Sequence, residues 1–270
     1  MALIQCDFKS RVLELSTSMN VILPENDNNS EAEKSSSRTE NNKYPVLYLL
    51  HGLSDDHTIW SRRTSIERYV EKYNLAVVMP AVHRSFYTDM EYGNEYWSFI
   101  SREIPEIASK YFPISTRRED NFVAGLSMGG YGAFKMGLRC PDKFSAAASL
   151  SGVLDIVSSY EENEESEEEG LEEFKLVYGN IDKVKNSKSD LMYLLKQNVE
   201  NEIELPDLFQ CCGTEDFLYE NNQNFKKLAE KLKVNLTYEE GPGDHQWSYW
   251  DKKIQRVLEW LPVTKIDAQE

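Results

Sequence analysis

The sequence predicts an α/β fold: one domain built on a mostly parallel open sheet with helices on both faces. Two observations point to it. Continuous apolar runs of strand length recur along the chain, and segments with apolar residues at helical spacing separate them. Strands that are apolar without alternation are buried on both faces, as in parallel sheets. A chain of 270 residues is long enough to bury an ample core around such a sheet.

The N-terminal part is expected to differ from the rest of the sheet. Apolar residues between Leu3 and Leu23 fall into short clusters, which predict two or three antiparallel strands. The polar segment 25–43 follows, and Ala32 is its only apolar residue. Such a segment cannot bury enough surface to offset its ordering entropy, so we interpret it as a loop inserted into the domain.

From residue 46 onward, strands and helices alternate. The predicted strands are Val46–Leu50, Leu75–Pro80, Phe122–Leu126, Phe144–Leu150, Leu205–Cys212 and Val234–Tyr238. The predicted helices are Trp97–Tyr111, Gly130–Leu138, Leu191–Val199, Phe225–Leu232 and Trp247–Leu261. This alternation implies βαβ units with right-handed crossovers. We therefore assign residues 1–270 to a single domain.

Residues 155–204 interrupt the alternation and show a helical pattern only near their end. Nine of the thirteen residues from Glu161 to Glu173 are glutamate. In a doubly wound sheet, an excursion of this kind lies beyond the strand ends, where ligands also bind. We interpret it as an acidic insertion in the lid region, although a charge run is more commonly a solvated surface.

Composition and charge exclude several classes of protein. The net charge of −16 comes from 46 acidic and 30 basic residues, which disfavours a nucleic-acid partner. No apolar run approaches the ~18 residues of a membrane helix. The first residues lack a secretory signal, and the four cysteines show no CxxC spacing. We expect a cytoplasmic protein without metal, cofactor or membrane contact, and the sequence leaves homo-oligomerisation open.

The strongest chemical signal is the motif Gly125-Leu126-Ser127-Met128-Gly129. It follows an apolar strand and precedes a helical segment, which is the setting of a nucleophile elbow. Such an elbow places its serine on a tight, strained turn, and a Cβ at either glycine would collide with the facing strand or helix. We predict that Ser127 is a nucleophile at the carboxyl end of the sheet.

A serine hydroxyl is a weak nucleophile and needs a general base. The four histidines are His51, His57, His83 and His245. In α/β-hydrolases the triad runs Ser, acid, His along the chain, and only His245 follows Ser127. It lies in a glycine-containing loop between the last predicted strand and the last predicted helix. We therefore predict that His245 is the base.

The acid that orients the imidazole must lie between these two residues. The aspartates in this interval are Asp142, Asp155, Asp182, Asp190, Asp207, Asp216 and Asp244. Asp216 follows the strand Leu205–Cys212, so its carboxylate comes from the same sheet edge as Ser127, and we prefer it. Glu215 is the alternative. Asp244 adjoins the base and is poorly placed to reach the imidazole.

Two backbone N–H groups are expected to form an oxyanion hole for the tetrahedral intermediate. One is that of Met128, the residue after the nucleophile. The other is that of Leu53, because Gly52 allows a tight turn after the strand Val46–Leu50. His51 is then a structural hydrogen-bonding residue rather than a catalytic one.

Four motifs together resemble those of the Putative esterase family. They are Leu50-His51-Gly52-Leu53-Ser54, Gly125-Leu126-Ser127-Met128-Gly129-Gly130, Cys212-Gly213-Thr214-Glu215-Asp216 and Gly243-Asp244-His245-Gln246-Trp247, and they occur in family order across residues 10–261. The family includes esterase D, tributyrin esterases and feruloyl esterases, and the chain is most similar to the small intracellular tributyrin esterases. The resemblance implies an α/β-hydrolase fold and the triad Ser127, Asp216 and His245, with Leu53 and Met128 as oxyanion donors.

The function that this reading implies is a serine carboxylesterase acting on short-chain acyl esters, with a small-molecule ester as its partner. S-formylglutathione hydrolysis is the alternative within the enzyme class. A non-catalytic hydrolase fold used for binding is the alternative from another class. Aromatic residues are expected to line the acyl pocket, chosen from Trp60, Phe86, Tyr87, Trp97 and Trp247, with the three tryptophans preferred.

Overall fold

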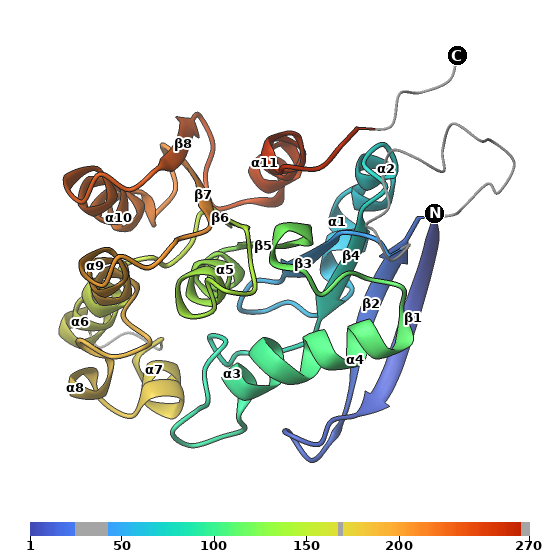
Figure 1. Ribbon diagram of the computed structural model, residues 1–270. Coiled ribbons are helices and arrows are strands. Elements are labelled where there is room, and N and C mark those ends of the chain that lie inside the picture. Colours follow the sequence, from blue (N-terminus) through green and yellow to red (C-terminus); the bar gives the residue numbers. More distant parts are fainter. Residues whose placement is uncertain (25–42, 167–169, 266–270) are drawn as a thin grey trace, which may run out of the picture.

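The computed structural model describes residues 1–24, 43–166 and 170–265, except for the side chains of residues 162–170. These residues form an eight-stranded sheet of order β1-β2-β4-β3-β5-β6-β7-β8 (Figure 1). The strands are β1 (Ala2–Lys9), β2 (Ser16–Leu23), β3 (Val46–Leu50), β4 (Ala76–Pro80), β5 (Asn121–Leu126), β6 (Ala146–Leu150), β7 (Asp207–Gly213) and β8 (Leu236–Gly241). Strands β3 to β8 pair in parallel, whereas β1 and β2 are antiparallel. The predicted fold class is confirmed.

Helices cover both faces of the sheet. One face carries α1 (Ile59–Arg63), α2 (Ile66–Glu71) and α11 (Trp247–Trp260), whose buried side chains share one core cluster. The other face carries α3 (Tyr96–Ser98), the π-helical turn η1 (Phe99–Glu103), α4 (Ile104–Tyr111), α5 (Met128–Arg139), α9 (Leu191–Glu200) and α10 (Tyr219–Lys231). The central strand β5 serves both clusters by alternation, since Val123 faces one and its neighbours Phe122 and Ala124 face the other.

The predicted helix Trp97–Tyr111 is divided by the π-helical turn η1. Pro105 has no N–H to donate to the carbonyl of Ser101 one turn earlier, which interrupts the regular hydrogen-bond ladder. The Ser101 carbonyl instead accepts a hydrogen bond from Lys143 Nζ at 3.0 Å. The continuous helix predicted from apolar spacing was therefore wrong in this detail.

Residues 155–204 contain more helix than their sequence indicated. The described part holds α6 (Ile156–Ser166), α7 (Gly170–Tyr178) and α8 (Ile181–Val184) before α9. These helices gather on the side of the molecule away from β1 and β2 (Figure 1). Phe174, Val177 and Tyr178 of α7 are buried in the core, so a helical pattern confined to the end of the region was wrong. Residues 25–42 of the predicted loop 25–43 lie outside the described residues.

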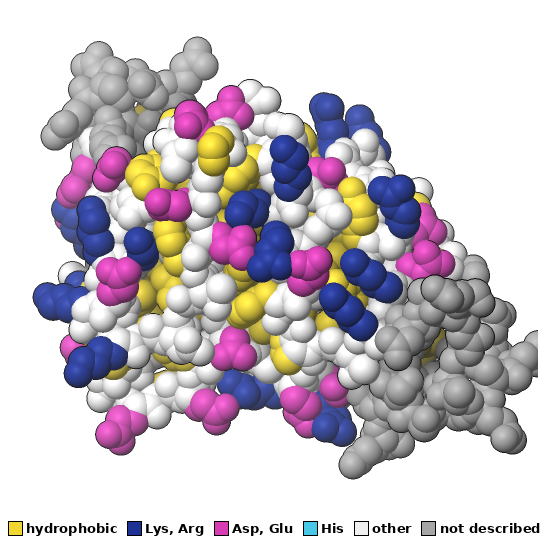
Figure 2. All heavy atoms as spheres, turned by 90° about the horizontal axis from the view of Figure 1, so that it is seen from above, with side chains coloured by type: hydrophobic (Ala, Val, Ile, Leu, Met, Phe, Trp, Pro, Cys, Tyr) yellow, Lys and Arg dark blue, Asp and Glu magenta, His cyan; other side chains and the backbone are white. Residues whose placement is uncertain are grey.

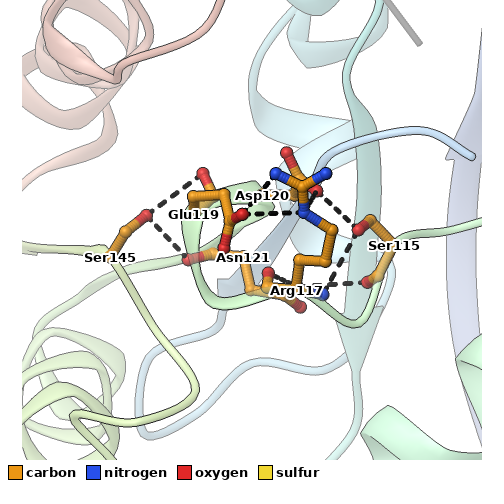
Figure 3. Close-up of polar contacts among 6 residues, drawn as sticks. All are labelled: Ser115, Arg117, Glu119, Asp120, Asn121 and Ser145. Carbon is orange, nitrogen blue, oxygen red and sulfur yellow. Dashed lines mark hydrogen bonds and ion pairs between the residues drawn. The ribbon is translucent and has the colours of Figure 1, made fainter. Parts of the chain in front are cut away.

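A polar network fixes the amino end of β5, at the opposite end of the strand from Ser127 (Figure 3). The Asn121 amide donates to the carbonyls of Ser115 at 3.1 Å and Arg117 at 2.6 Å. The Ser115 hydroxyl donates to Asp120 at 2.6 Å, and Ser145 reaches the Glu119 carbonyl at 3.3 Å. These bonds anchor the start of the strand that carries the nucleophile elbow at its end.

Candidate active site

Ser127 lies on a strained turn between β5 and α5. Its φ of 52° and ψ of −121° are sparsely populated by residues other than glycine. A Cβ at Gly125 would lie 2.3 Å from the Gly129 carbonyl oxygen, and one at Gly129 would lie 2.6 Å from the carbonyl oxygen of Leu50. Both positions therefore need glycine for this turn to pack against β3. The close approach holds the Ser127 side chain at the carboxyl end of the sheet.

His245 reaches Ser127 from the loop between β8 and α11. Its Nε2 is 2.9 Å from Ser127 Oγ across 118 positions of sequence. The ring packs on Phe217, with 4.5 Å between centroids, and edge-on against Trp250 at 4.8 Å. The side chain is 18% exposed, so the imidazole is held in place while one side stays open to a small molecule.

Asp216 lies against the other nitrogen of the same imidazole. Both carboxylate oxygens are 3.0 Å from His245 Nδ1, and one of them accepts the Leu218 N–H at 2.9 Å. Burial by itself would raise the pKa of this carboxyl, but hydrogen bonds from His245, Leu218 N–H and the Ser151 hydroxyl hold it below its usual value. The carboxylate is therefore ionised, which fixes the proton on Nδ1 and leaves Nε2 to accept the Ser127 proton.

The two alternative acids make other contacts. The Glu215 carboxylate accepts the Gly243 backbone N–H at 2.5 Å and the Thr214 hydroxyl at 2.8 Å. It thus holds the loop that carries His245 instead of contacting the imidazole. Asp244 accepts a hydrogen bond from the Gln246 side chain at 2.6 Å.

The predicted oxyanion donors, Leu53 and Met128, flank the nucleophile. Met128 is the first residue of α5, so its N–H has no acceptor within the helix. The Leu53 N–H donates to no backbone acceptor among the described residues. A Cβ at Gly52 would lie 3.8 Å from the Ser127 Cβ, which brings this loop beside the elbow.

His51 clamps the loop that contains Leu53. Its Nδ1 donates to the Gly52 carbonyl at 2.7 Å, and its Nε2 accepts the Val82 N–H at 3.0 Å. Tyr87 OH donates to the His51 carbonyl at 2.9 Å. Burial lowers the pKa of His51 to about 4, so this ring is neutral and structural, as the sequence predicted.

The three tryptophans proposed for the acyl pocket lie in different surroundings. Trp60 is buried and donates its indole N–H to the Leu50 carbonyl at 3.0 Å. Trp247 is half-buried and contacts Trp60 edge-on, with 5.1 Å between centroids. Trp97 packs against Lys135 and Arg139 in the second half of α5, more than two turns beyond Ser127. The structure thus brings Trp60 and Trp247 together and places Trp97 elsewhere.

Two residues at the site were not found from the sequence. Ser151, just after β6, has a φ of 49° and accepts the Trp250 indole N–H at 3.2 Å while hydrogen bonding to Asp216. Its place directly beyond a predicted strand was the available signal. Phe217 follows Asp216 and is 77% exposed, which is unusual for a large apolar residue.

The fold and the site define a class of protein. It is an α/β-hydrolase in which a carboxylate is hydrogen bonded to a histidine and the histidine to a serine. The Putative esterase family model matches residues 10–261. The chain therefore belongs to the Putative esterase family, as its motifs predicted.

Individual relatives agree with this assignment. The acetyl esterase of Caldicellulosiruptor saccharolyticus is 31% identical over 264 residues, which cover 97% of this chain and 98% of the relative. The fluorophosphonate-binding serine hydrolase FphF of Staphylococcus aureus is 37% identical with a TM-score of 0.84, covering 96% of this chain and 98% of its own. The S-formylglutathione hydrolase FrmB of the same species is 36% identical with a TM-score of 0.82 and the same coverage. The protein is a carboxylic ester hydrolase.

Among the described residues, none of the helices is both long and apolar enough to cross a membrane. The described residues also hold no group of three or more His, Cys, Asp or Glu side chains suited to a metal ion.

Proposed function

We propose that the protein is a serine carboxylesterase that hydrolyses short-chain acyl esters through Ser127, His245 and Asp216. The observation that carries the proposal is the continuous hydrogen-bonded line from Asp216 through the imidazole to the Ser127 hydroxyl, at 3.0 Å and 2.9 Å. Each of the three side chains comes from a different loop, and a line of this kind is the arrangement that activates a serine.

Hydrolysis proceeds in two steps. His245 Nε2 takes the Ser127 proton as Oγ attacks the ester carbonyl, and Asp216 stabilises the resulting imidazolium. The N–H groups of Leu53 and Met128 donate to the developing oxyanion, and each such donor is worth ~3 kcal/mol of barrier lowering. The imidazolium then protonates the leaving alcohol. Water, deprotonated by His245, releases the acid from the acyl-enzyme and restores Ser127.

Two features favour a small, neutral ester. The acetyl esterase relative supports a short acyl group. Phe217 presents an exposed apolar ring against His245, where the alcohol part of an ester would leave.

The insertion 155–204 is assigned to the border of the substrate site. Its helices α6 to α9 follow β6, and the end of β6 carries Ser151 beside Asp216.

S-formylglutathione is a second candidate substrate, because FrmB is 36% identical to this chain. The net charge of −16 opposes long-range attraction of this anionic thioester, whereas a neutral ester is unaffected. Comparing kcat/KM for S-formylglutathione with that for p-nitrophenyl acetate decides between them. A higher value for the thioester would replace the oxygen-ester proposal.

The proposal is tested with p-nitrophenyl acetate, butyrate and decanoate on the wild type and on Ser127→Ala, with Ser109→Ala on α4 as the matched control. We expect kcat/KM for acetate and butyrate to exceed that for decanoate by about tenfold or more, since one methylene that does not fit a short acyl pocket costs ~1–3 kcal/mol. Ser127→Ala should abolish turnover, and Ser109→Ala should retain it. Full activity of Ser127→Ala would contradict the assignment of Ser127 as the nucleophile. The site around Ser127 would then be a non-catalytic binding site.

A further inference from the structure

A cavity lies at the far end of α5 from Ser127. Its volume is about 450 Å³, and it lies between the α3–η1 segment, the end of α5 and helix α9. Four basic side chains line it, and we call it the basic groove: Arg102, Arg139, Lys143 and Lys188. Helix α5 has 12 residues, so its two ends are ~18 Å apart, and the basic groove is separate from the triad.

The lining of the basic groove is positively charged, whereas the protein as a whole is negatively charged. The whole chain has 46 acidic residues against 30 basic ones, yet none of the lining residues is acidic. On α11, by contrast, Lys253 and Arg256 pair with Glu239 at 2.9 Å and 3.0 Å. The face seen from above, where α11 lies in Figure 1, likewise mixes acidic and basic side chains (Figure 2).

Among the described residues, nearby carboxylates form no ion pair with these cations, although the charge of Asp89 favours the charged form of Arg139. Asp89 accepts the Ser98 backbone N–H at 2.8 Å and the Ser98 hydroxyl at 3.0 Å. Glu106 lies 3.8 Å from Arg11. Asp142 is exposed and does not line the basic groove. Within the part of the chain that the structure describes, none of the four cations forms an ion pair with a carboxylate at 4.0 Å or less.

The neutral polar groups of the basic groove are already engaged. The Ser101 hydroxyl donates to the Trp97 carbonyl at 2.7 Å, and the Asn198 amide donates to the Leu138 carbonyl at 2.8 Å. The Ser98 hydroxyl is bound to Asp89. The donors left for a ligand are therefore chiefly cationic, which selects an anion over a neutral sugar or alcohol.

Arg139 is held in a fixed position for this purpose. Its guanidinium carbon lies over the Trp97 ring, 3.7 Å from the ring centre, which is a cation–π contact. A guanidinium held on an aromatic face can still form paired N–H bonds to phosphate oxygens. Arg102, Lys143 and Lys188 are exposed around it, and Lys143 also donates to the Ser101 carbonyl.

We propose that the basic groove binds a small phosphate-bearing metabolite at a site separate from the ester-hydrolysing centre. The volume fits a ligand of metabolite size, since such sites typically span ~300–1,000 Å³. Several positive charges and one planar, pre-positioned guanidinium match a group with several charged oxygens better than a single carboxylate.

Isothermal titration of the full chain with pyrophosphate tests the proposal. We expect saturable binding with a Kd of about 1 mM or tighter at physiological salt. Malonate should bind at least about tenfold more weakly, because it offers fewer charged oxygens. No saturable heat with pyrophosphate up to about 10 mM would overturn the site, and equal affinity for malonate would overturn the assignment to phosphate.

Matched charge variants distinguish binding in the basic groove from nonspecific electrostatic attraction of pyrophosphate to the protein. The double variant Arg102→Gln/Lys143→Gln should weaken pyrophosphate binding by about tenfold or more, since each charged hydrogen bond is worth ~1.5–3 kcal/mol. The double variant Lys227→Gln/Lys231→Gln on α10 removes the same charge elsewhere and should bind as the wild type does. Equal weakening in both would overturn the proposal. If the first variant melts at lower temperature, Arg102→Gln alone provides the test, because this exposed side chain makes no ion pair among the described residues.

Discussion

Two loops at the carboxyl edge of the sheet each present a histidine, and the two imidazoles have opposite surroundings. His51, after β3, is 1% exposed and bonded through both nitrogens to backbone groups. His245, after β8, is bonded through both nitrogens to side chains, Asp216 and Ser127, and keeps 18% of its side chain exposed. The first loop holds the Leu53 N–H in place, and the second carries the proposed base.

The comparison shows that the partner atoms, and not the residue type, decide what an imidazole can do. A ring that accepts a backbone N–H has no free lone pair for a substrate proton. A ring that accepts a serine O–H and donates to a carboxylate can move that proton and hold the resulting charge. Variants of the two loops should therefore fail in different ways.

The largest expected effect is the loss of turnover in His245→Ala. Removing the base should lower kcat by about 10⁴-fold or more, because triad members act as a unit. The midpoint of urea unfolding should change little, since the ring is partly exposed. His83→Ala, which removes an exposed histidine, is the control for activity. Retention of wild-type kcat by His245→Ala would show that His245 is no more catalytic than His51.

The next largest effect distinguishes Asp216 from Glu215, the two neighbouring acidic residues in the loop after β7. Asp216→Asn should lower kcat by about 10³–10⁴-fold, because an amide does not stabilise the imidazolium and permits the wrong tautomer. Glu215→Gln keeps an acceptor for the Gly243 N–H, so its effect on kcat should stay within about tenfold, the cost of one weakened hydrogen bond. Steady-state kinetics on both variants measures the difference, and the reverse order would make Glu215 the acid.

The burial of His51 should make the free energy of unfolding depend on pH. The pKa of His51 is about 4 in the folded state, against 6.5 for an unburied histidine, so between these values the unfolded chain binds more protons. The contribution of His51 is complete above pH 6.5 and is lost as the pH falls toward 4. It amounts to ~3 kcal/mol over the full interval.

Urea unfolding between pH 6.5 and 5 measures this contribution. Over that window the free energy of unfolding should fall by ~1 kcal/mol per pH unit on account of His51. His51→Gln has no group that takes up a proton in this range, so it should show a shallower slope. An unchanged slope in that variant would assign the acid sensitivity to other groups.

The smallest effect concerns the ring that covers His245. Phe217→Ala should raise KM for phenyl acetate by about two- to tenfold with little change in kcat, as aromatic contacts are worth ~0.5–1.5 kcal/mol. Tyr111→Ala, which removes another exposed ring at the end of α4, should leave KM unchanged. A fall in kcat alone would show that Phe217 orients the imidazole and does not contact the ester.

Much of the sheet could be predicted from the sequence because buried parallel strands are continuous apolar runs. Val46–Leu50 was predicted with the bounds that β3 has in the structure. The triad was predicted from chain order and from placement after strands, and the structure brings these three side chains within hydrogen-bonding distance of one another. The short helices α1 and α2 were missed because five or six residues are too few for a helical period to show.

Tertiary contacts decided the remaining features. Helix α7 is buried through Phe174 and Tyr178 although glutamates precede these residues, so its local charge gave little sign of its packing. Ser151 could not be found because its role depends on Trp250, nearly 100 positions away, and on Asp216. The basic groove likewise joins Arg102 and Lys188, which no local pattern connects.

The central claim is that the imidazole of His245 makes the Ser127 hydroxyl a nucleophile. The most direct measurement is the reaction of the folded protein with a fluorophosphonate probe, followed by peptide mass spectrometry. We predict a single adduct on Ser127 in the wild type, and a labelling rate at least about 100-fold lower in His245→Ala. An adduct on another residue, or equally fast labelling of Ser127 without His245, would contradict the account.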